Sequence, residues 1–215
     1  MHWIDPNHLL PIRGKVDCLL ANLAGERDGF VLIYDDGREI LVQVPPHLSM
    51  ELSNAIQVGD IVTVRGLKPR HADVIAAVSI EGRDGGIVLD QDPPKHKPQP
   101  EGGKMTTHTV AIYGDVRLTL FSPKGKPRGA LLTDGTVLRL DVKDASRWRD
   151  VLRLGAGLRA RGRAIATDEG LIVAVDEIDA GDSVFKAIAK PRTPEQQETH
   201  PRASAPIVLT PSSLS

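Results

Sequence analysis

Residues 129–135 read Gly-Ala-Leu-Leu-Thr-Asp-Gly, and residues 136–142 continue as Thr-Val-Leu-Arg-Leu-Asp-Val. An apolar run leads into an Asp-Gly pair and leaves it as a segment in which apolar and polar residues alternate. Asp-Gly favours the tight turns that join antiparallel strands, so this stretch predicts a β-hairpin. Residues 29–44 repeat the pattern, with Asp36-Gly37 in place of Asp134-Gly135. The chain therefore carries the same hairpin twice.

The segments around the first hairpin predict three strands, a short helix and two more strands. We expect the strands at residues 13–20, 30–34, 39–44, 61–65 and 74–81. Pro45-Pro46 ends the third strand, because proline lacks the N–H that a strand ladder needs. The helix is predicted from the spacing of Leu48, Met50, Leu52 and Ile56. This order of elements is typical of the OB-fold, a five-stranded Greek-key barrel.

The second hairpin lies in a second copy of the same pattern, about 100 residues further along the chain. Arg65-Gly66 matches Arg161-Gly162, for example, and Gly29 matches Gly129. A fixed period with glycines kept at the turns indicates a duplicated domain. The predicted fold is all-β with short helices, as two tandem five-stranded OB-fold-like barrels. Whether the two barrels pack together does not follow from the sequence.

The copies divide the chain into five predicted segments. They are a leader at residues 1–12, a first domain at 13–82, a Pro/Gly-rich linker at 83–107, a second domain at 108–189 and a disordered tail at 190–215. Within the linker, residues 87–89 form an apolar patch that could add a strand to a barrel edge.

One motif of the first copy is similar to that of a known group of proteins. Asp36-Gly37 is followed by Pro45-Pro46-His47-Leu48 and then by Val58-Gly59-Asp60-Ile61-Val62. In this, residues 14–81 resemble uncharacterised bacterial proteins described as OB-fold or nucleic-acid-binding-like. The second copy departs from the motif, with Asp141-Val142-Lys143-Asp144 where Pro-Pro-His would stand. The resemblance implies the fold and carries no catalytic residue.

Composition narrows the class of protein. The chain is 40% hydrophobic and 26% charged, with a net charge of −1. No apolar run approaches the roughly 20 residues of a transmembrane helix, and no signal peptide is evident, so we expect a cytoplasmic protein. The single Cys18 excludes an internal disulfide, and its apolar strand pattern predicts a buried, unreactive thiol. No histidine pair has metal-ligand spacing and no catalytic motif is present, so we expect neither an enzyme nor a cofactor.

Basic residues gather in the second copy and point to a ligand. Residues 108–181 hold 12 basic and 10 acidic residues, net +2, whereas residues 14–82 hold 6 and 10, net −4. Period two sends Arg159, Arg161 and Arg163 to one face of the predicted fourth strand. Guanidinium groups bind phosphate and stack on bases. The predicted nucleic-acid-binding residues of this copy are Arg139, Arg159, Arg161, Arg163, Arg147, the stacking residue Trp148, and the loop residues Lys124, Lys126 and Arg128.

Two aromatic residues of the first copy are further candidates. Phe30 and Tyr34 share one face of the predicted second strand, and OB-folds bind ligands across strands two and three. The alternative is that both fill the core or a domain interface. The arginines likewise have an alternative, as a solvated face paired with nearby acids.

The leading hypothesis is a tandem OB-fold protein that binds single-stranded DNA or RNA weakly and without sequence preference, through the arginine-rich face of the second copy. The alternative is a protein–protein interaction or scaffold module with no nucleic-acid or catalytic role. In that case the arginines would meet an acidic protein surface.

Overall fold

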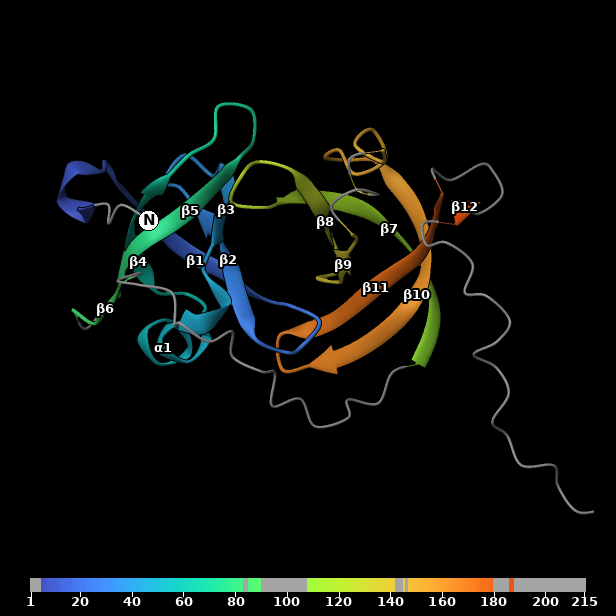
Figure 1. Cartoon of the computed structure of the whole chain (residues 1–215), viewed down its shortest axis with the longest axis horizontal. Coiled ribbons are helices and arrows are strands. Elements are labelled where there is room, and N and C mark those ends of the chain that lie inside the picture. Colours follow the sequence, from blue (N-terminus) through green and yellow to red (C-terminus); the bar gives the residue numbers. More distant parts are fainter. Residues whose placement is uncertain are drawn as a thin grey trace, which may run out of the picture.

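The computed structural model describes residues 5–82, 85–89, 108–141, 145, 147–179 and 186–187. They form two β-barrels that lie side by side (Figure 1), which confirms the predicted fold class. The predicted tail at 190–215 and most of the predicted linker lie outside these ranges. Within the described part of the chain, no helix is long and apolar enough to cross a membrane.

The first barrel closes through its third and fifth strands. Its strands follow the order β3-β2-β1-β4-β5, and β3 pairs with β5 in parallel. Its elements are the 3-10 helices Pro6–His8 and Pro46–Leu48, helix α1 (Ser49–Ala55), and strands β1 (Pro11–Ala21), β2 (Arg27–Ile33), β3 (Glu39–Gln43), β4 (Ile61–Leu67), β5 (Val74–Glu81) and β6 (Ile87–Leu89). Strand β6 pairs with the free edge of β5, which confirms the strand predicted from the apolar patch of the linker.

The second barrel repeats this topology. Its strands follow the order β10-β7-β8-β9-β11, and β10 pairs with β11 to close the barrel. They are β7 (His108–Phe121), β8 (Pro127–Leu132), β9 (Val137–Arg139), β10 (Gly157–Thr167) and β11 (Gly170–Asp179), with β12 (Lys186–Ala187) added beside β11. Strand β9 is shorter than predicted and ends at Arg139, although the Leu140 N–H still donates to the Arg128 carbonyl at 2.8 Å.

The β8–β9 hairpin forms as its sequence predicts. Gly135 adopts φ +88°, and its N–H donates to the Leu132 carbonyl to close the turn. The Asp134 carboxylate accepts a bond from the Thr136 N–H at 2.8 Å, which is the Asx bond that favours Asp in turns. At the other end, Gly129 has φ +155°, and a Cβ there would lie 1.8 Å from the Leu138 carbonyl oxygen. Only glycine fits this close approach of two strands.

Each barrel has its own apolar interior. Val16, Phe30, Leu32 and Val42 lie inside the first, together with Leu48, Leu52 and Ile56 from the segment around α1. The predicted helix is thus present, but Met50 is 76% exposed, which corrects its assignment to the apolar face. Met50 is two residues from both Leu48 and Leu52, and a two-residue step turns a helix side chain away from that face.

A third apolar cluster joins the two barrels. Val31 and Leu41 of the first barrel pack with Leu131, Val137 and Ile172 of the second. These side chains lie on the outer faces of β2 and β3 and of β8, β9 and β11, and most are less than 2% exposed. Both faces of the central strands are therefore buried, which explains their nearly continuous apolar sequence.

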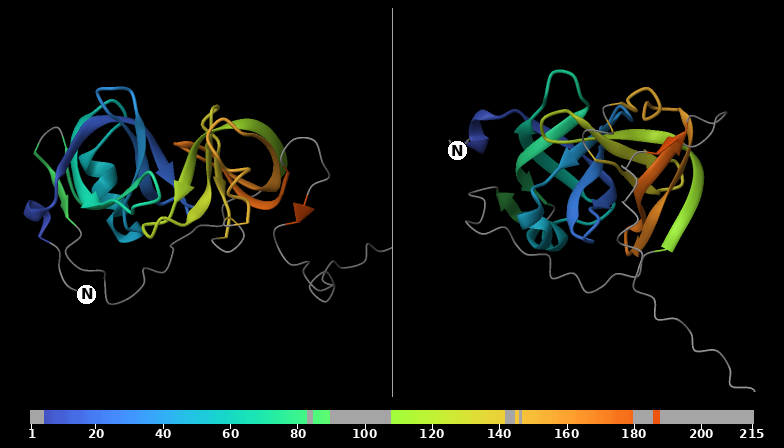
Figure 2. Two further views of the ribbon diagram at one scale, coloured as in Figure 1. Left: turned by 90° about the horizontal axis from the view of Figure 1, so that it is seen from above. Right: turned by 45° about the vertical axis from the view of Figure 1, so that its right-hand side comes forward.

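The two barrels contact each other reciprocally. The β1–β2 end of the first barrel reaches the β10–β11 turn of the second (Figures 1 and 2), where Arg27 Nε lies 2.6 Å from Glu169 Oε1. Conversely, Gly125 in the β7–β8 turn rests against Pro69 and Ala72 in the β4–β5 connection of the first barrel. Equivalent loops thus meet on the two sides of the interface, through an ion pair on one side and apolar packing on the other, as in a two-fold dimer whose subunits have been joined in one chain.

Cys18 packs against the cluster between the barrels, and burial raises the pKa of its thiol from 9.0 to about 11. The folded protein therefore holds a proton that the unfolded chain releases above about pH 9. We expect the free energy of unfolding to fall between pH 9 and 11 by more in the wild type than in Cys18→Ala. Urea unfolding of both proteins across this range measures the difference. Parallel pH profiles would contradict the raised pKa.

Candidate functional site

Packing of the barrels covers the surface that OB-folds commonly use. That surface lies over strands two and three and the adjoining loops. Here the outer faces of β2 and β3 pack against those of β8 and β9, so this surface is covered in both barrels. In this arrangement these faces are therefore closed to a ligand.

Phe30 and Tyr34 show the consequence for the predicted aromatic contacts. Phe30 is fully buried in the interior of the first barrel, so it fills the core and is not a ligand contact. The alternation of β2 could not reveal this, because Val31 on the opposite face is equally buried. Tyr34 is half-buried at the rim of the same core, with the Arg38 guanidinium 5.2 Å from its ring centroid.

Arg139, predicted as a phosphate contact, instead bridges the two barrels. Its Nη2 donates to Asp28 Oδ1 at 2.6 Å and to the Ala21 carbonyl at 2.7 Å, and both side chains of the ion pair are 11% exposed. Burial raises the pKa of Asp28, and the positive charge of Arg139 lowers it by less. The pair therefore fixes the interface and has little freedom to bind a ligand.

A second bridge was not predicted from the sequence. Arg117 donates to Glu39 at 2.8 Å and also pairs with Asp17, across the barrel interface. Asp17 and Arg117 occupy equivalent bulges of β1 and β7, 100 residues apart. Asp28 and Arg128 are separated by the same interval. Equivalent residues of two copies meet near a two-fold axis, where like charges would repel. Opposite charges at equivalent positions of the two copies were therefore a sequence signal for this interface.

Arg159, Arg161 and Arg163 form the β10 arginine row, which meets solvent. All three are exposed, whereas Leu158, Ala160, Gly162 and Ala164 between them are buried, as period two predicts. Two of the three arginines pair with acids on β11. Arg161 lies 3.4 Å from Glu177 and Arg163 lies 3.9 Å from Asp176, and the side chains of both arginines are at least 50% exposed. Exposed pairs of this kind contribute little energy and compete weakly with another anion.

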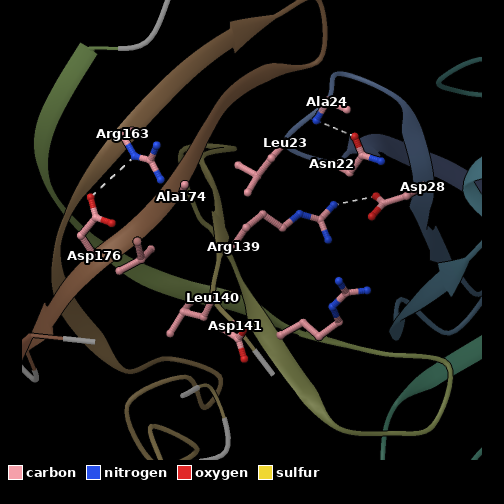
Figure 3. A pocket seen from close by; sticks show the side chains of 12 residues that line it. Asn22, Leu23, Ala24, Asp28, Arg139, Leu140, Asp141, Arg163, Ala174 and Asp176 are labelled. Carbon is pink, nitrogen blue, oxygen red and sulfur yellow. Dashed lines mark hydrogen bonds and ion pairs between the residues drawn. The ribbon is translucent and has the colours of Figure 1, made fainter. Parts of the chain in front are cut away.

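One end of the arginine row opens into a cleft of about 510 Å³ between the barrels. Figure 3 shows Arg163 with Asp176 on one wall, Arg139 extending toward Asp28 on the other, and Leu23 between them. Arg128 also lines this cleft. Three arginines and three aspartates make the cleft mixed in charge, so it extends the arginine row without forming a strongly basic pocket.

The remaining predicted residues lie apart from the arginine row. Lys124 and Lys126 are exposed on the β7–β8 turn, which rests on the first barrel. Arg147 is exposed on the connection between β9 and β10, and Trp148 beside it packs partly against the second core. The structure thus brings together Arg128, Arg139 and Arg163 at the cleft, and Arg159 and Arg161 on the same strand as Arg163. No group of three or more metal-ligating side chains occurs in the ranges that the structure covers.

Comparisons with known proteins give little guidance on a ligand. No protein-family model and no curated protein matches the chain. Among solved structures, it is similar to the single-stranded DNA binding protein from Thermus aquaticus, with 13% identity, a TM-score of 0.26, and coverage of 81% of this chain and 92% of that one. A deletion mutant of that protein gives 12% identity, a TM-score of 0.25, and coverage of 82% and 95%. Because these values are low, the case for a ligand depends on the residues of this chain.

Proposed function

We propose that this protein binds single-stranded nucleic acid, weakly and without sequence preference, along the β10 arginine row. The observation that carries the proposal is the exposed series of Arg159, Arg161 and Arg163 on one face of one strand. Alternate residues of a strand lie about 6.6 Å apart. This resembles the separation of successive phosphates in an extended single strand, so each guanidinium can meet one phosphate.

The form of the row also favours a weak and non-specific contact. Guanidinium groups on a convex barrel surface reach the backbone, which carries charge but no sequence information. The neighbouring Glu177 and Asp176 oppose the approach of phosphate and limit affinity. A binding protein rather than an enzyme is part of the proposal, because the sequence contains no catalytic motif.

The test is fluorescence anisotropy with a labelled oligonucleotide of about 20 nucleotides, longer than the roughly 4–16 nucleotides that one OB-fold occupies. Single-stranded DNA, single-stranded RNA and duplex are compared at several salt concentrations. The triple variant Arg159→Ala, Arg161→Ala, Arg163→Ala should bind much more weakly. Its salt slope should fall by about 2, since each phosphate contact on a single strand contributes roughly 0.7.

The matched control removes three exposed cations from the first barrel, as Arg13→Ala, Lys15→Ala and Arg70→Ala. It changes the net charge equally and should keep the wild-type slope. Glu177→Gln, which removes the acid beside Arg161, should strengthen binding. If both triple variants lose the same affinity, or if the wild type does not bind at low salt, the proposal is wrong.

A further inference from the structure

An exposed tyrosine lies beside the β10 arginine row. Tyr113 on β7 is directly opposite Arg159 on β10 in the antiparallel register, so the two side chains are on the same face of the sheet. Tyr113 is 66% exposed, and among the described residues no other aromatic side chain is classed as exposed. The sequence pattern gives no sign of this role, because only the register of β7 with β10 links Tyr113 to the arginines.

The hydroxyl of this tyrosine lies near a glycine on the neighbouring strand. Gly157 pairs with Asp115, and a Cβ at Gly157 would lie 3.5 Å from the Tyr113 hydroxyl. The tyrosine side chain therefore extends toward the first residue of β10. This is the end of the arginine row at which Arg159 lies. The Asp115 carboxylate lies beside the same glycine, with Oδ1 3.3 Å from that Cβ position.

The two tyrosines of the chain differ in their contacts with arginine. Among the described residues, the Arg38 guanidinium makes a cation–π contact with the ring of Tyr34. Tyr113 makes no such contact with Arg159. Tyr113 is therefore an exposed ring beside Arg159, the first arginine of the row.

We propose that Tyr113 is a stacking platform for an unpaired base of a strand whose phosphates follow Arg159, Arg161 and Arg163. This inference rests on the proposed function and adds the base contact to it. Stacking on an aromatic side chain accepts every base, which suits binding without sequence preference. Trp148, predicted for this role from the sequence, packs partly against the second core.

The experiment compares Tyr113→Ala and Tyr113→Phe with the wild type in the anisotropy assay. Two probes are used, a single-stranded oligothymidylate and a strand of equal length with abasic sites. Tyr113→Ala should bind the oligothymidylate about tenfold more weakly, and Tyr113→Phe should bind it like the wild type. All three should bind the abasic strand equally, with an unchanged salt slope, because stacking neutralises no phosphate.

The outcomes separate this inference from the proposed function. If Tyr113→Ala binds oligothymidylate like the wild type while the triple arginine variant loses affinity, stacking on Tyr113 is wrong and the arginine contact stands. An equal loss on both probes would make Tyr113 a structural residue and would also overturn the inference. If the wild type binds neither strand, both proposals fail.

Discussion

Replacing Arg139 with Ala should lower the free energy of unfolding by about 3–5 kcal/mol, as expected when one partner of a buried ion pair is removed. The change leaves the Asp28 carboxylate buried between the barrels, and the Ala21 carbonyl also loses its donor. Both partners of the pair are 11% exposed, so water compensates poorly. Urea unfolding followed by circular dichroism measures the loss.

The pH dependence of this variant provides an independent check. Burial already raises the pKa of Asp28 above 3.8, and removal of Arg139 should raise it further. Stability gained by a carboxyl with a raised pKa is present at low pH and is lost as the pH rises through the folded-state pKa. The defect of Arg139→Ala should therefore be smallest in acid and largest at neutral pH.

Two controls locate the effect in the uncompensated charge. Arg161→Ala breaks an exposed pair with Glu177 and should cost less than about 1 kcal/mol. The double variant Asp28→Leu, Arg139→Met removes both charges and should recover most of the stability, because apolar replacement of a buried pair is often neutral. The ion pair does not stabilise the interface as described if the double variant is as unstable as Arg139→Ala. The same holds if Arg139→Ala lowers the free energy of unfolding by less than about 1 kcal/mol.

Gly129→Ala should lower the free energy of unfolding by more than about 4 kcal/mol, an exceptionally large loss for a single substitution. The new Cβ would lie 1.8 Å from the Leu138 carbonyl oxygen and 2.8 Å from its carbon. Both are backbone atoms of the paired strand, so the contact can be relieved only by separating β8 from β9. The φ of +155° at Gly129 adds strain for any residue with a side chain.

Gly86→Ala is the matched control for this substitution. An added Cβ at Gly86 meets no atom within 4 Å, and φ lies outside the glycine region. It should change the stability by less than about 0.5 kcal/mol. Urea midpoints and the yield of soluble protein compare the two variants. If Gly129→Ala unfolds within about 1 kcal/mol of the wild type, the close approach of β8 and β9 is not as described.

The duplicated hairpin, the strand order and the face of each arginine follow from the sequence because they depend on local chemistry. Asp-Gly pairs set the turns, proline ends β3, and a period of two divides each strand into two faces. These local signals predicted both barrels and the β10 arginine row. They also predicted β5 to the residue, at Val74–Glu81.

The environment of each face was decided only by the tertiary structure. Arg139 and Arg161 both occupy polar positions of an alternating strand. Arg139 is nevertheless buried against Asp28, whereas Arg161 is exposed. Period two tells which side of a strand a residue occupies, but not whether that side meets solvent or another barrel. That difference depends on the packing of surfaces about 100 residues apart in the chain, where shape and opposite charge on both copies must match.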